Sequence, residues 1–311
     1  MNNIPSISVV IPLYNKEENI KKTIQSVLNQ TYKNYEIIVI NDGSTDNSKK
    51  QVESLQNKII KIIDKPNGGV SSARNLGMKE AQYNYIAFLD GDDLWEPTYL
   101  EEMCNLISDF PHASMWGCNY DYYKNSRYIS RKTISSTSYR GILNHYFEMV
   151  YYDLLFCSSS IIIDKKRALD IGGFDEKMSM GEDLDMWFRM ILSYEIAYYN
   201  KTLTHYNLDG INRAMKKKHD YTKSFLCYTN KYKEEESHNE EFRKFINQFR
   251  CNKIIDLFAN YDINNSMLNS YISSIDFSVV KKKWKIYCNL PFILKKIIAL
   301  YYNNKITYET K

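Results

Sequence analysis

The 311-residue chain lacks several features that mark other protein classes. Its six cysteines include no C-x-x-C pair, so neither a zinc site nor a disulfide framework is indicated, and a reducing cytoplasm fits this usage best. No stretch approaches the roughly 18 to 20 uncharged apolar residues that a membrane helix needs. The N-terminus has no basic region ahead of its short apolar run, which argues against a signal peptide.

A strong net charge is also absent. The 41 Lys and Arg residues against 37 Asp and Glu leave +4, which is too mild and too interspersed to indicate a nucleic-acid partner. Dinucleotide dehydrogenases and P-loop enzymes are excluded because G-x-G-x-x-G and G-x-x-x-x-G-K-[ST] do not occur. The composition, 44% apolar and 25% charged, is that of an ordinary globular protein of about two domains at roughly 150 residues each.

The first half of the chain alternates between strand and helix patterns. Apolar runs predict strands at Ile7–Ile11, Tyr35–Ile40, Ile59–Ile63 and Tyr85–Asp90, separated by segments with helical spacing, the first of which we expect Asn15 to cap. This alternation predicts an α/β fold with a mostly parallel sheet and helices on both faces. Ligands on such a sheet bind beyond the carboxyl ends of the strands.

Acidic residues gather at those carboxyl ends. Asp90, Asp92 and Asp93 place three carboxylates within four residues after the fourth strand, where they repel one another unless a cation lies between them. Carboxylates, water and phosphate oxygens are the ligands of Mg²⁺ or Mn²⁺ held against a diphosphate. A solvated acidic turn is the alternative for a D-x-D sequence by itself.

Six motifs follow one another along the chain: SVVIPLYN at 8–15, NDGSTD at 41–46, GGVSSARN at 68–75, FLDGDD at 88–93, GGFDE at 172–176 and GED at 181–183. In order and spacing they resemble the motifs of the inverting family 2 glycosyltransferases. That resemblance covers roughly residues 5–210 and implies the GT-A fold, a Rossmann-like sheet flanked by helices. The expected domains are a glycosyltransferase domain at 1–215, with a nucleotide-binding half at 1–115 and an acceptor half at 116–215, and a helical C-terminal region at 216–311.

The resemblance also implies which residues bind the donor nucleotide. In that family the loop after the first strand lies along the nucleotide, and the carboxylate after the second strand, here Asp42, hydrogen-bonds the nucleobase, usually uracil. The first carboxylate of the D-x-D motif, Asp90, faces the ribose and metal side. A turn or helix-capping role is the alternative for Asp42. The donor-binding residues implied are Pro12, Tyr14, Glu17, Asp42, Arg74, Asp90 and Gly91.

A bound Mn²⁺ or Mg²⁺ is the cofactor that the resemblance implies. Asp92 is the expected metal ligand, and Asp93 shares that assignment because the alignment within a run of acids is ambiguous by one residue. His205 stands where family members often carry a histidine near the diphosphate or metal. A structural histidine is the alternative for His205.

The segment 182–192 predicts an amphipathic helix with acids in its first turn. These acids could merely complement the helix dipole. Displacement at an anomeric carbon, however, needs a base for the acceptor hydroxyl. The resemblance assigns that role to Asp183, with Glu182 orienting the acceptor or the loop. We expect Asp185 and Arg189 to form only a surface pair.

The alternation of strands and helices stops at about Lys216, and helical spacing follows. Basic clusters mixed with aromatic and aliphatic residues at 281–302 have the composition of an interfacial helix and make this region a candidate for peripheral membrane contact. The alternative is a packed helix with lysines on its solvent face.

The resemblance predicts an inverting, metal-dependent glycosyltransferase that uses a nucleoside-diphosphate sugar, UDP-linked by preference, to build a bacterial surface polysaccharide. The expected acceptor is a saccharide or lipid-linked saccharide, and the expected location is the cytoplasm, including the inner face of the membrane. A nucleotidyltransferase-like enzyme is the rival enzyme class, but it would carry a glycine-rich loop after the first strand. A non-catalytic nucleotide-sugar-binding module is the other alternative.

Overall fold

The computed structural model describes residues 4–131, 138–150, 154–209 and 219–309, with backbone alone from 302 to 309. The predicted domain boundary at residue 215 lies outside the described residues. The chain divides into two units: a first unit of Met1–Tyr146, Tyr152–Glu176 and Asp183–Asn212, and a second unit of Phe147–Tyr151, Lys177–Glu182 and Arg213–Lys311.

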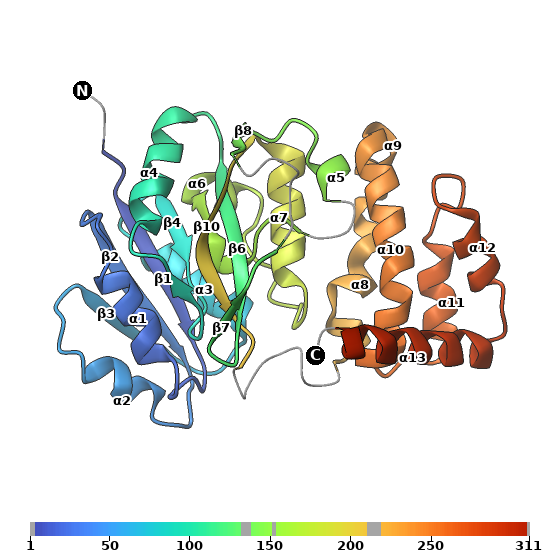
Figure 1. Cartoon of the computed structure of the whole chain (residues 1–311), viewed down its shortest axis with the longest axis horizontal. Coiled ribbons are helices and arrows are strands. Elements are labelled where there is room, and N and C mark those ends of the chain that lie inside the picture. Colours follow the sequence, from blue (N-terminus) through green and yellow to red (C-terminus); the bar gives the residue numbers. More distant parts are fainter. Residues whose placement is uncertain (1–3, 132–137, 151–153, 210–218, 310–311) are drawn as a thin grey trace. The chain divides into compact units, whose positions relative to one another are not determined.

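A ten-stranded sheet forms the centre of the first unit (Figure 1). Its strands are β1 (Ile7–Leu13), β2 (Tyr35–Asp42), β3 (Ile60–Lys65), β4 (Tyr85–Phe88), β5 (Leu94–Trp95), β6 (Met115–Lys124), β7 (Arg127–Ile129), β8 (Arg140–Ile142), β9 (Ile161–Asp164) and β10 (Ile196–Asn207).

The strand order is β3-β2-β1-β4-β9-β6-β10-β5, with β7 paired to β6 and β8 paired to β10. Strands β1 to β4 pair in parallel, as predicted. Strand β9 runs antiparallel to both β4 and β6, so the sheet is mixed beyond β4. The four parallel strands therefore carry the loops that follow β1, β2, β3 and β4 to one edge of the sheet.

Helices cover the sheet and explain why its central strands are largely buried. Ile7, Val9 and Val10 of β1 are fully buried. Helix α3 (Val70–Glu80) packs against β1 and β2. At Gly77 of this helix an added Cβ would lie 2.2 Å from the Val10 Cγ1, so the close approach requires glycine.

The remaining helices are spread along the chain. In the first half they are α1 (Ile20–Leu28), α2 (Ser48–Glu53) and α4 (Tyr99–Asp109), and in the middle α5 (Tyr146–Met149), α6 (Lys165–Asp170) and α7 (Glu182–Ser193). After residue 218 follow α8 (Phe225–Tyr228), α9 (Lys233–His238), α10 (Glu240–Asn260), α11 (Asn265–Ser273), α12 (Lys282–Cys288) and α13 (Phe292–Glu309), and 3₁₀ turns lie at Ser158–Ser160, Tyr221–Lys223 and Thr229–Tyr232.

The start of α1 differs from the sequence expectation. The helix begins at Ile20 after Asn19, so Asn15 is not its cap. Asn15 instead has a φ of 51° in the loop that follows β1. This left-handed conformation is one that asparagine adopts more readily than most residues.

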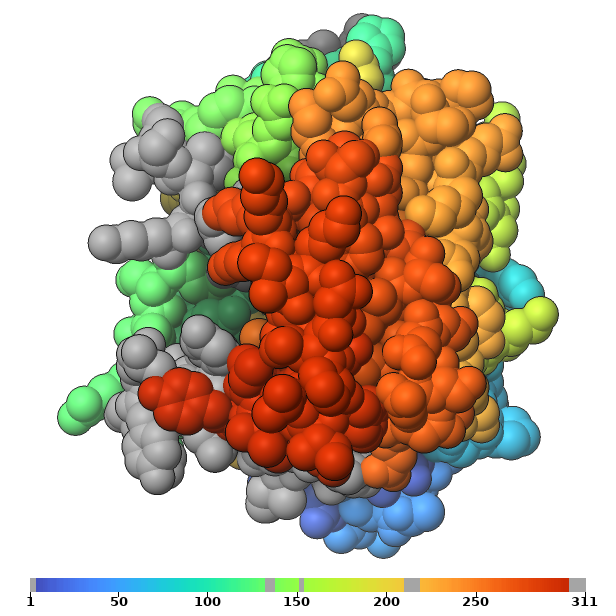
Figure 2. Space-filling model, turned by 90° about the vertical axis from the view of Figure 1, so that its right-hand side faces the viewer, coloured from blue at the N-terminus to red at the C-terminus, as the bar shows by residue number. Residues whose placement is uncertain are grey.

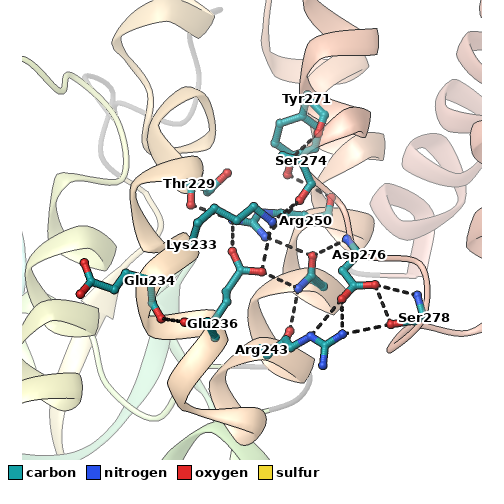
Figure 3. A network of polar contacts seen from close by, with 12 residues as sticks. Thr229, Lys233, Glu234, Glu236, Arg243, Arg250, Tyr271, Ser274, Asp276 and Ser278 are labelled. Carbon is teal, nitrogen blue, oxygen red and sulfur yellow. Dashed lines mark hydrogen bonds and ion pairs between the residues drawn. The ribbon is translucent and has the colours of Figure 1, made fainter.

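The second unit is helical, as predicted, and contains a buried polar network around Arg250 (Figure 3). The Arg250 guanidinium is fully buried, lies 2.8 Å from the Glu236 carboxylate and donates to the Thr229 carbonyl. Asn247 donates to Glu236 and, through its carbonyl, accepts from Arg250. We call Arg250, Glu236 and Asn247 with the adjoining Arg243–Asp276 pair the Arg250 network. None of the helices in the described ranges combines the length and apolar character needed to cross a bilayer.

Candidate active site

Hydrogen bonds join the loop after β1 to the loop after β2. The Asn15 Oδ1 accepts from the Thr45 N–H at 2.8 Å, and the Lys16 N–H donates to the Ser48 hydroxyl at 2.7 Å. Glu17 accepts from the Asn47 N–H at 2.8 Å. These contacts hold the predicted nucleotide-binding residue Glu17 in a fixed loop.

Two further predicted donor-binding residues lie in the same β1 loop. The side chain of Tyr14 is 46% exposed, so a ligand could reach its ring. Pro12 lies at the end of β1, and its carbonyl would be 3.4 Å from a Cβ added at Gly91. The loop that contains Gly91 therefore passes close to the β1 loop.

Asp42 ends β2, and its buried carboxylate is held by the next loop. Its Oδ1 accepts from Lys65 and from the Gly68 N–H, and its Oδ2 accepts from the Gly69 N–H at 2.9 Å. Gly69 has a φ of 86°, which suits glycine. A carboxylate oxygen has room for two hydrogen bonds, so Oδ2 can accept another donor such as a nucleobase N–H.

Arg74 and Asp90 form an ion pair beside the D-x-D loop. The Arg74 guanidinium donates to the Asp90 Oδ1 at 2.8 Å and lies 5.3 Å from the centre of the Phe174 ring. The Arg74 side chain is 3% exposed, whereas that of Asp90 is 30% exposed. A buried cation thus points toward a carboxylate that a ligand can reach.

The second carboxylate of the motif, Asp92, is paired with a lysine from the β1 loop. The Lys16 Nζ lies 2.5 Å from the Asp92 Oδ2, and both side chains are mostly buried. The lysine therefore supplies a positive charge at the oxygen where a metal is expected. An incoming metal would have to share or take over this oxygen.

Asp93 is the most deeply buried acid of the D-x-D loop. Its Oδ2 accepts from the Ser159 hydroxyl at 2.6 Å and its Oδ1 from the Asn207 N–H at 2.9 Å. Burial, together with the charges of Asp92 and Asp90, raises the pKa of Asp93 well above its ordinary value. Coordination of a metal by Asp93 would require these protein contacts to break.

Asp183 lies in the first turn of α7, and its electrostatic environment connects it to the D-x-D loop. Burial raises the pKa of Asp183, the Arg74 charge lowers it, and the Asp90 charge raises it. The Asp183 Oδ1 also accepts from the Leu184 N–H at 2.8 Å. The first unit thus gathers what we call the acidic cluster, which consists of Asp90, Asp92, Asp93 and Asp183.

Glu182, the other predicted catalytic acid, is the first residue of α7 and is buried. It directly precedes Asp183 in the chain.

His205 lies between two carboxylates. Its Nδ1 is 2.6 Å from Asp121 and its Nε2 is 2.8 Å from Glu96. Burial lowers the pKa of His205, but the hydrogen bonds and charges of Asp121 and Glu96 outweigh it, so the pKa is raised. Each ring nitrogen thus has a protein partner, and metal binding by His205 would require one of these contacts to break.

The Asp185–Arg189 pair differs from the sequence expectation. Asp185 is fully buried, and Arg189 also donates to the carbonyls of Ile171 and Gly173. The prediction of a surface pair was wrong, because this arginine fastens the loop at residues 171–173 to α7.

Four polar residues at the site were missed by sequence reasoning. They are Lys16, Lys65, Ser159 and Asn75. The Asn75 Oδ1 accepts from the Phe174 N–H, and the Asn75 Nδ2 donates to the Phe174 carbonyl, each at 2.9 Å. Asn75 was inside the GGVSSARN motif, so its position was a usable signal. Lys16, Lys65 and Ser159 gave no such sequence signal, because their hydrogen-bond partners lie far from them along the chain.

The charges of the acidic cluster suit a divalent cation that the protein shares with a donor. Within the described residues no group of three or more His, Cys, Asp and Glu side chains is arranged to hold a metal by itself. Mg²⁺ is commonly bound by one or two carboxylates plus substrate phosphates, so a preformed cage is not required. Asp92, the metal ligand expected from the sequence, fits that partial ligand set.

The mixed sheet with flanking helices is a GT-A-like fold. The crystal structure of S. aureus TarS 1–349 in complex with UDP-GlcNAc matches with a TM-score of 0.74 and 18% identity over 94% of this chain and 89% of that chain. The chain belongs to glycosyl transferase family 2, whose family model matches residues 8–172. The predicted family and the predicted α/β class with a C-terminal helical region are both confirmed.

Curated relatives of this chain are named as glycosyltransferases or as a synthase. An uncharacterized glycosyltransferase of Rickettsia typhi is 32% identical over 64% of this chain and 63% of its own length. Glycosyltransferase GlyA of Streptococcus pneumoniae is 30% identical over 65% of this chain and 30% of its own length. Hyaluronan synthase of Pasteurella multocida is 29% identical over 70% of this chain and 22% of its own length. The chain thus spans less than two thirds of the length of these relatives.

Proposed function

We propose that this protein is an inverting, metal-dependent glycosyltransferase that transfers a sugar from a UDP-sugar to an acceptor hydroxyl. The acceptor is a saccharide or lipid-linked saccharide in the synthesis of a bacterial surface polysaccharide such as capsule, O-antigen or exopolysaccharide. Membership of family 2, the UDP-GlcNAc complex of TarS and the hyaluronan synthase among the relatives support this proposal.

One observation carries the proposal. Asp183, at the start of α7, lies within electrostatic reach of Arg74 and Asp90. Those two residues form the ion pair beside the D-x-D loop. This proximity supports the proposal that the candidate base and the candidate donor-binding residues belong to one site, as a transfer reaction requires.

Asp183 is the general base of the proposed reaction. Its carboxylate takes the proton of the acceptor hydroxyl, and the acceptor oxygen forms a bond to the anomeric carbon from the face opposite the diphosphate. The bond from that carbon to the diphosphate oxygen breaks, its electron pair stays on the oxygen, and UDP leaves. Such a step inverts the anomeric configuration. Glu182, next to Asp183, orients the acceptor or the loop.

The remaining site residues bind and orient the donor. Asp42 accepts a hydrogen bond from the base through its Oδ2, and the loop with Pro12, Tyr14 and Glu17 lies along the nucleotide. Arg74 holds Asp90 toward the ribose. Gly91 keeps the D-x-D loop close to the β1 loop, because an added Cβ would lie 3.3 Å from the Lys16 Cγ.

Asp92 would hold Mn²⁺ or Mg²⁺, with Asp93 and His205 as further predicted ligands once their protein contacts open. The ion would supply positive charge to the leaving diphosphate. Lys16 lies at the Asp92 oxygen and can turn to the diphosphate when that oxygen binds the metal.

For the location we propose the cytoplasm, at the inner face of the cell membrane. The six cysteines are free thiols, as is usual in a reducing compartment.

A donor screen tests the proposal. The purified chain is melted with UDP-GlcNAc, UDP-glucose, UDP-galactose and UDP-glucuronate, each with and without Mn²⁺, and UDP release is then measured with saccharide acceptors. We expect one donor to stabilise the protein only with Mn²⁺, by about 2.7 kcal/mol at a hundred times its Kd. NMR of the product should give the inverted anomer. Binding without transfer would favour the non-catalytic alternative, and a retained anomer would contradict the direct displacement.

A further inference from the structure

The C-terminal segment of the second unit concentrates positive charge. Residues 277–308 contain seven lysines and no acid, so the rest of the chain carries 34 basic against 37 acidic residues. A chain with a net charge of +4 is thus slightly acidic outside this segment. The charge is a local feature of helices α12 and α13.

The same helices expose apolar side chains. Ile293, Ile297, Leu300 and Tyr301 of α13 follow the spacing i, i+4, i+7, i+8, which places them on one face of a helix. Ile293 is 70% exposed and Tyr301 is 66% exposed. In Figure 2 the red end of the colour bar, which covers α12 and α13, occupies the face turned toward the viewer.

The opposite side of α13 packs into the unit. Ala299 and Lys295 are buried, and the Phe292 ring contacts Phe258 of α10. The Lys295 Nζ donates to the Cys288 carbonyl at the end of α12, and the Tyr287 hydroxyl donates to the Lys295 carbonyl. These contacts join α12 to α13, so their exposed residues belong to one continuous region.

Lysines surround the exposed apolar residues. Lys282, Lys283 and Lys285 are exposed on α12 next to Ile286, which is itself 67% exposed. Lys296 is exposed on α13 beside Ile297. We call the exposed residues Lys282, Lys283, Lys285, Ile286, Ile293, Lys296, Ile297, Leu300 and Tyr301 the basic-apolar face.

Two acids close to this region of the chain pair with residues outside the basic-apolar face. Asp276, the last acid before the segment, pairs with Arg243 and accepts from Ser278 (Figure 3). Asp256 pairs with Lys253. Neither Asp276 nor Asp256 therefore pairs with a lysine of the basic-apolar face.

We propose that the basic-apolar face binds the surface of an anionic lipid bilayer, with the isoleucines and Tyr301 entering the interface and the lysines contacting the headgroups. Exposed apolar residues bordered by lysines without acids are the pattern of an interfacial helix. A second copy of this chain would bring the same positive charge to the contact and be repelled. A polyanion such as RNA would leave the isoleucines unburied. This inference extends the proposed location and does not depend on the transfer reaction.

Vesicle flotation of the full chain tests the inference. The vesicles are phosphatidylcholine alone or phosphatidylcholine with about 30 mol% phosphatidylglycerol, an anionic content that attracts lysines. We expect binding to the anionic vesicles only, and loss of binding in about 0.5 M NaCl, where screening is strong. The triple variant Lys282→Gln, Lys283→Gln, Lys285→Gln should lower the partition coefficient about a hundredfold.

Two more variants separate charge from apolar contact. Ile293→Ser with Ile297→Ser should weaken binding about tenfold or more, because two apolar side chains no longer enter the interface. The matched control Lys21→Gln, Lys22→Gln, Lys58→Gln removes three exposed lysines of the first unit and should bind as the wild type does. Unchanged circular dichroism and UDP-sugar binding show that each variant is folded.

The inference would be overturned by no binding to anionic vesicles, by equal binding of the α12 lysine variant, or by binding of the chain to heparin without any binding to vesicles. A concentration-dependent dimer that Ile293→Ser, Ile297→Ser abolishes would also overturn it, since it would assign the face to a second copy. None of these results depends on sugar transfer, so the proposed enzyme activity stands or falls separately.

Discussion

The acidic cluster of the first unit and the Arg250 network of the second unit balance their charges differently. In the acidic cluster four carboxylates face two cations, Arg74 and Lys16. In the Arg250 network, Glu236 is paired with the buried Arg250 and with Lys233, and Asp276 is paired with Arg243, so no carboxylate lacks a cation. Buried charge by itself therefore does not identify a functional site, whereas an excess of one sign indicates that a ligand of the opposite charge completes it.

The largest effect should come from the balanced network. Arg250→Met leaves the buried Glu236 carboxylate with only the half-exposed Lys233, whose Nζ lies 3.3 Å away, so the second unit should lose about 3 kcal/mol of stability. Native-state hydrogen exchange of the α10 amides measures this. The control is Arg243→Met, since Arg243 and Asp276 have side chains that are 39% and 30% exposed and should contribute only about 0–1 kcal/mol. Equal losses in the two variants would contradict the distinction between them.

In the acidic cluster a substitution should change chemistry more than stability. Asp183→Asn removes the proposed base and should lower kcat at least about a hundredfold while leaving the donor Kd nearly unchanged. Asp170→Asn changes an exposed acid of the first unit and serves as the matched control. Near-normal turnover by Asp183→Asn would refute the assignment.

The pH dependence of the wild type sharpens the same point. Because burial raises the pKa of Asp183 above the ordinary 3.8, the base is protonated and inactive at a higher pH than a solvated Asp would be. Transfer measured as kcat/KM should rise with pH through that raised pKa, about tenfold per unit on the acid side. An acid limb at or below the ordinary value would show that the titrating base is an exposed carboxylate.

Asp42 should affect donor binding more than turnover. Asp42→Asn exchanges a charged acceptor for a neutral one and should raise the donor Kd about tenfold to a hundredfold. Isothermal titration with the UDP-sugar found in the screen measures this, and kcat at saturating donor should change less. A change confined to kcat would move Asp42 from base recognition to catalysis.

The smallest effect concerns the excess charge itself. Lys16→Met removes the cation at Asp92 and should strengthen Mn²⁺ binding in the absence of nucleotide by about two- to fivefold, because the metal no longer competes with the lysine for the Asp92 oxygen. Mn²⁺ titration followed by electron paramagnetic resonance reports this without any transfer. Weaker Mn²⁺ binding in the variant would mean that Lys16 does not compete for the metal site.

The strands and the main acids could be predicted from sequence because their signals are local. Apolar runs predicted the parallel strands β1 to β4, and the motif residues Asp42, Arg74 and Asp90 lie at the ends of those strands or just after them. The insertion of β9 between β4 and β6 was not predicted, because strand order depends on packing over the whole sheet.

The contacts that set the chemistry were harder to predict. Lys16 and Asp92 are 76 residues apart, and Asn75 and Phe174 are 99 apart, so no local spacing relates them. The i, i+4 spacing of Asp185 and Arg189 predicted a pair, but it carried no information on burial. Pattern indicates which residues can meet, and packing decides which of them are buried.

A crystal structure with UDP and Mn²⁺ tests the central claim most directly. The account predicts Mn²⁺ coordinated by Asp92 and by both phosphates, uracil at the Asp42 Oδ2, and the Asp183 carboxylate facing the open side of the diphosphate. A nucleotide bound away from the D-x-D loop, or an Asp183 carboxylate turned away from that space, would contradict it.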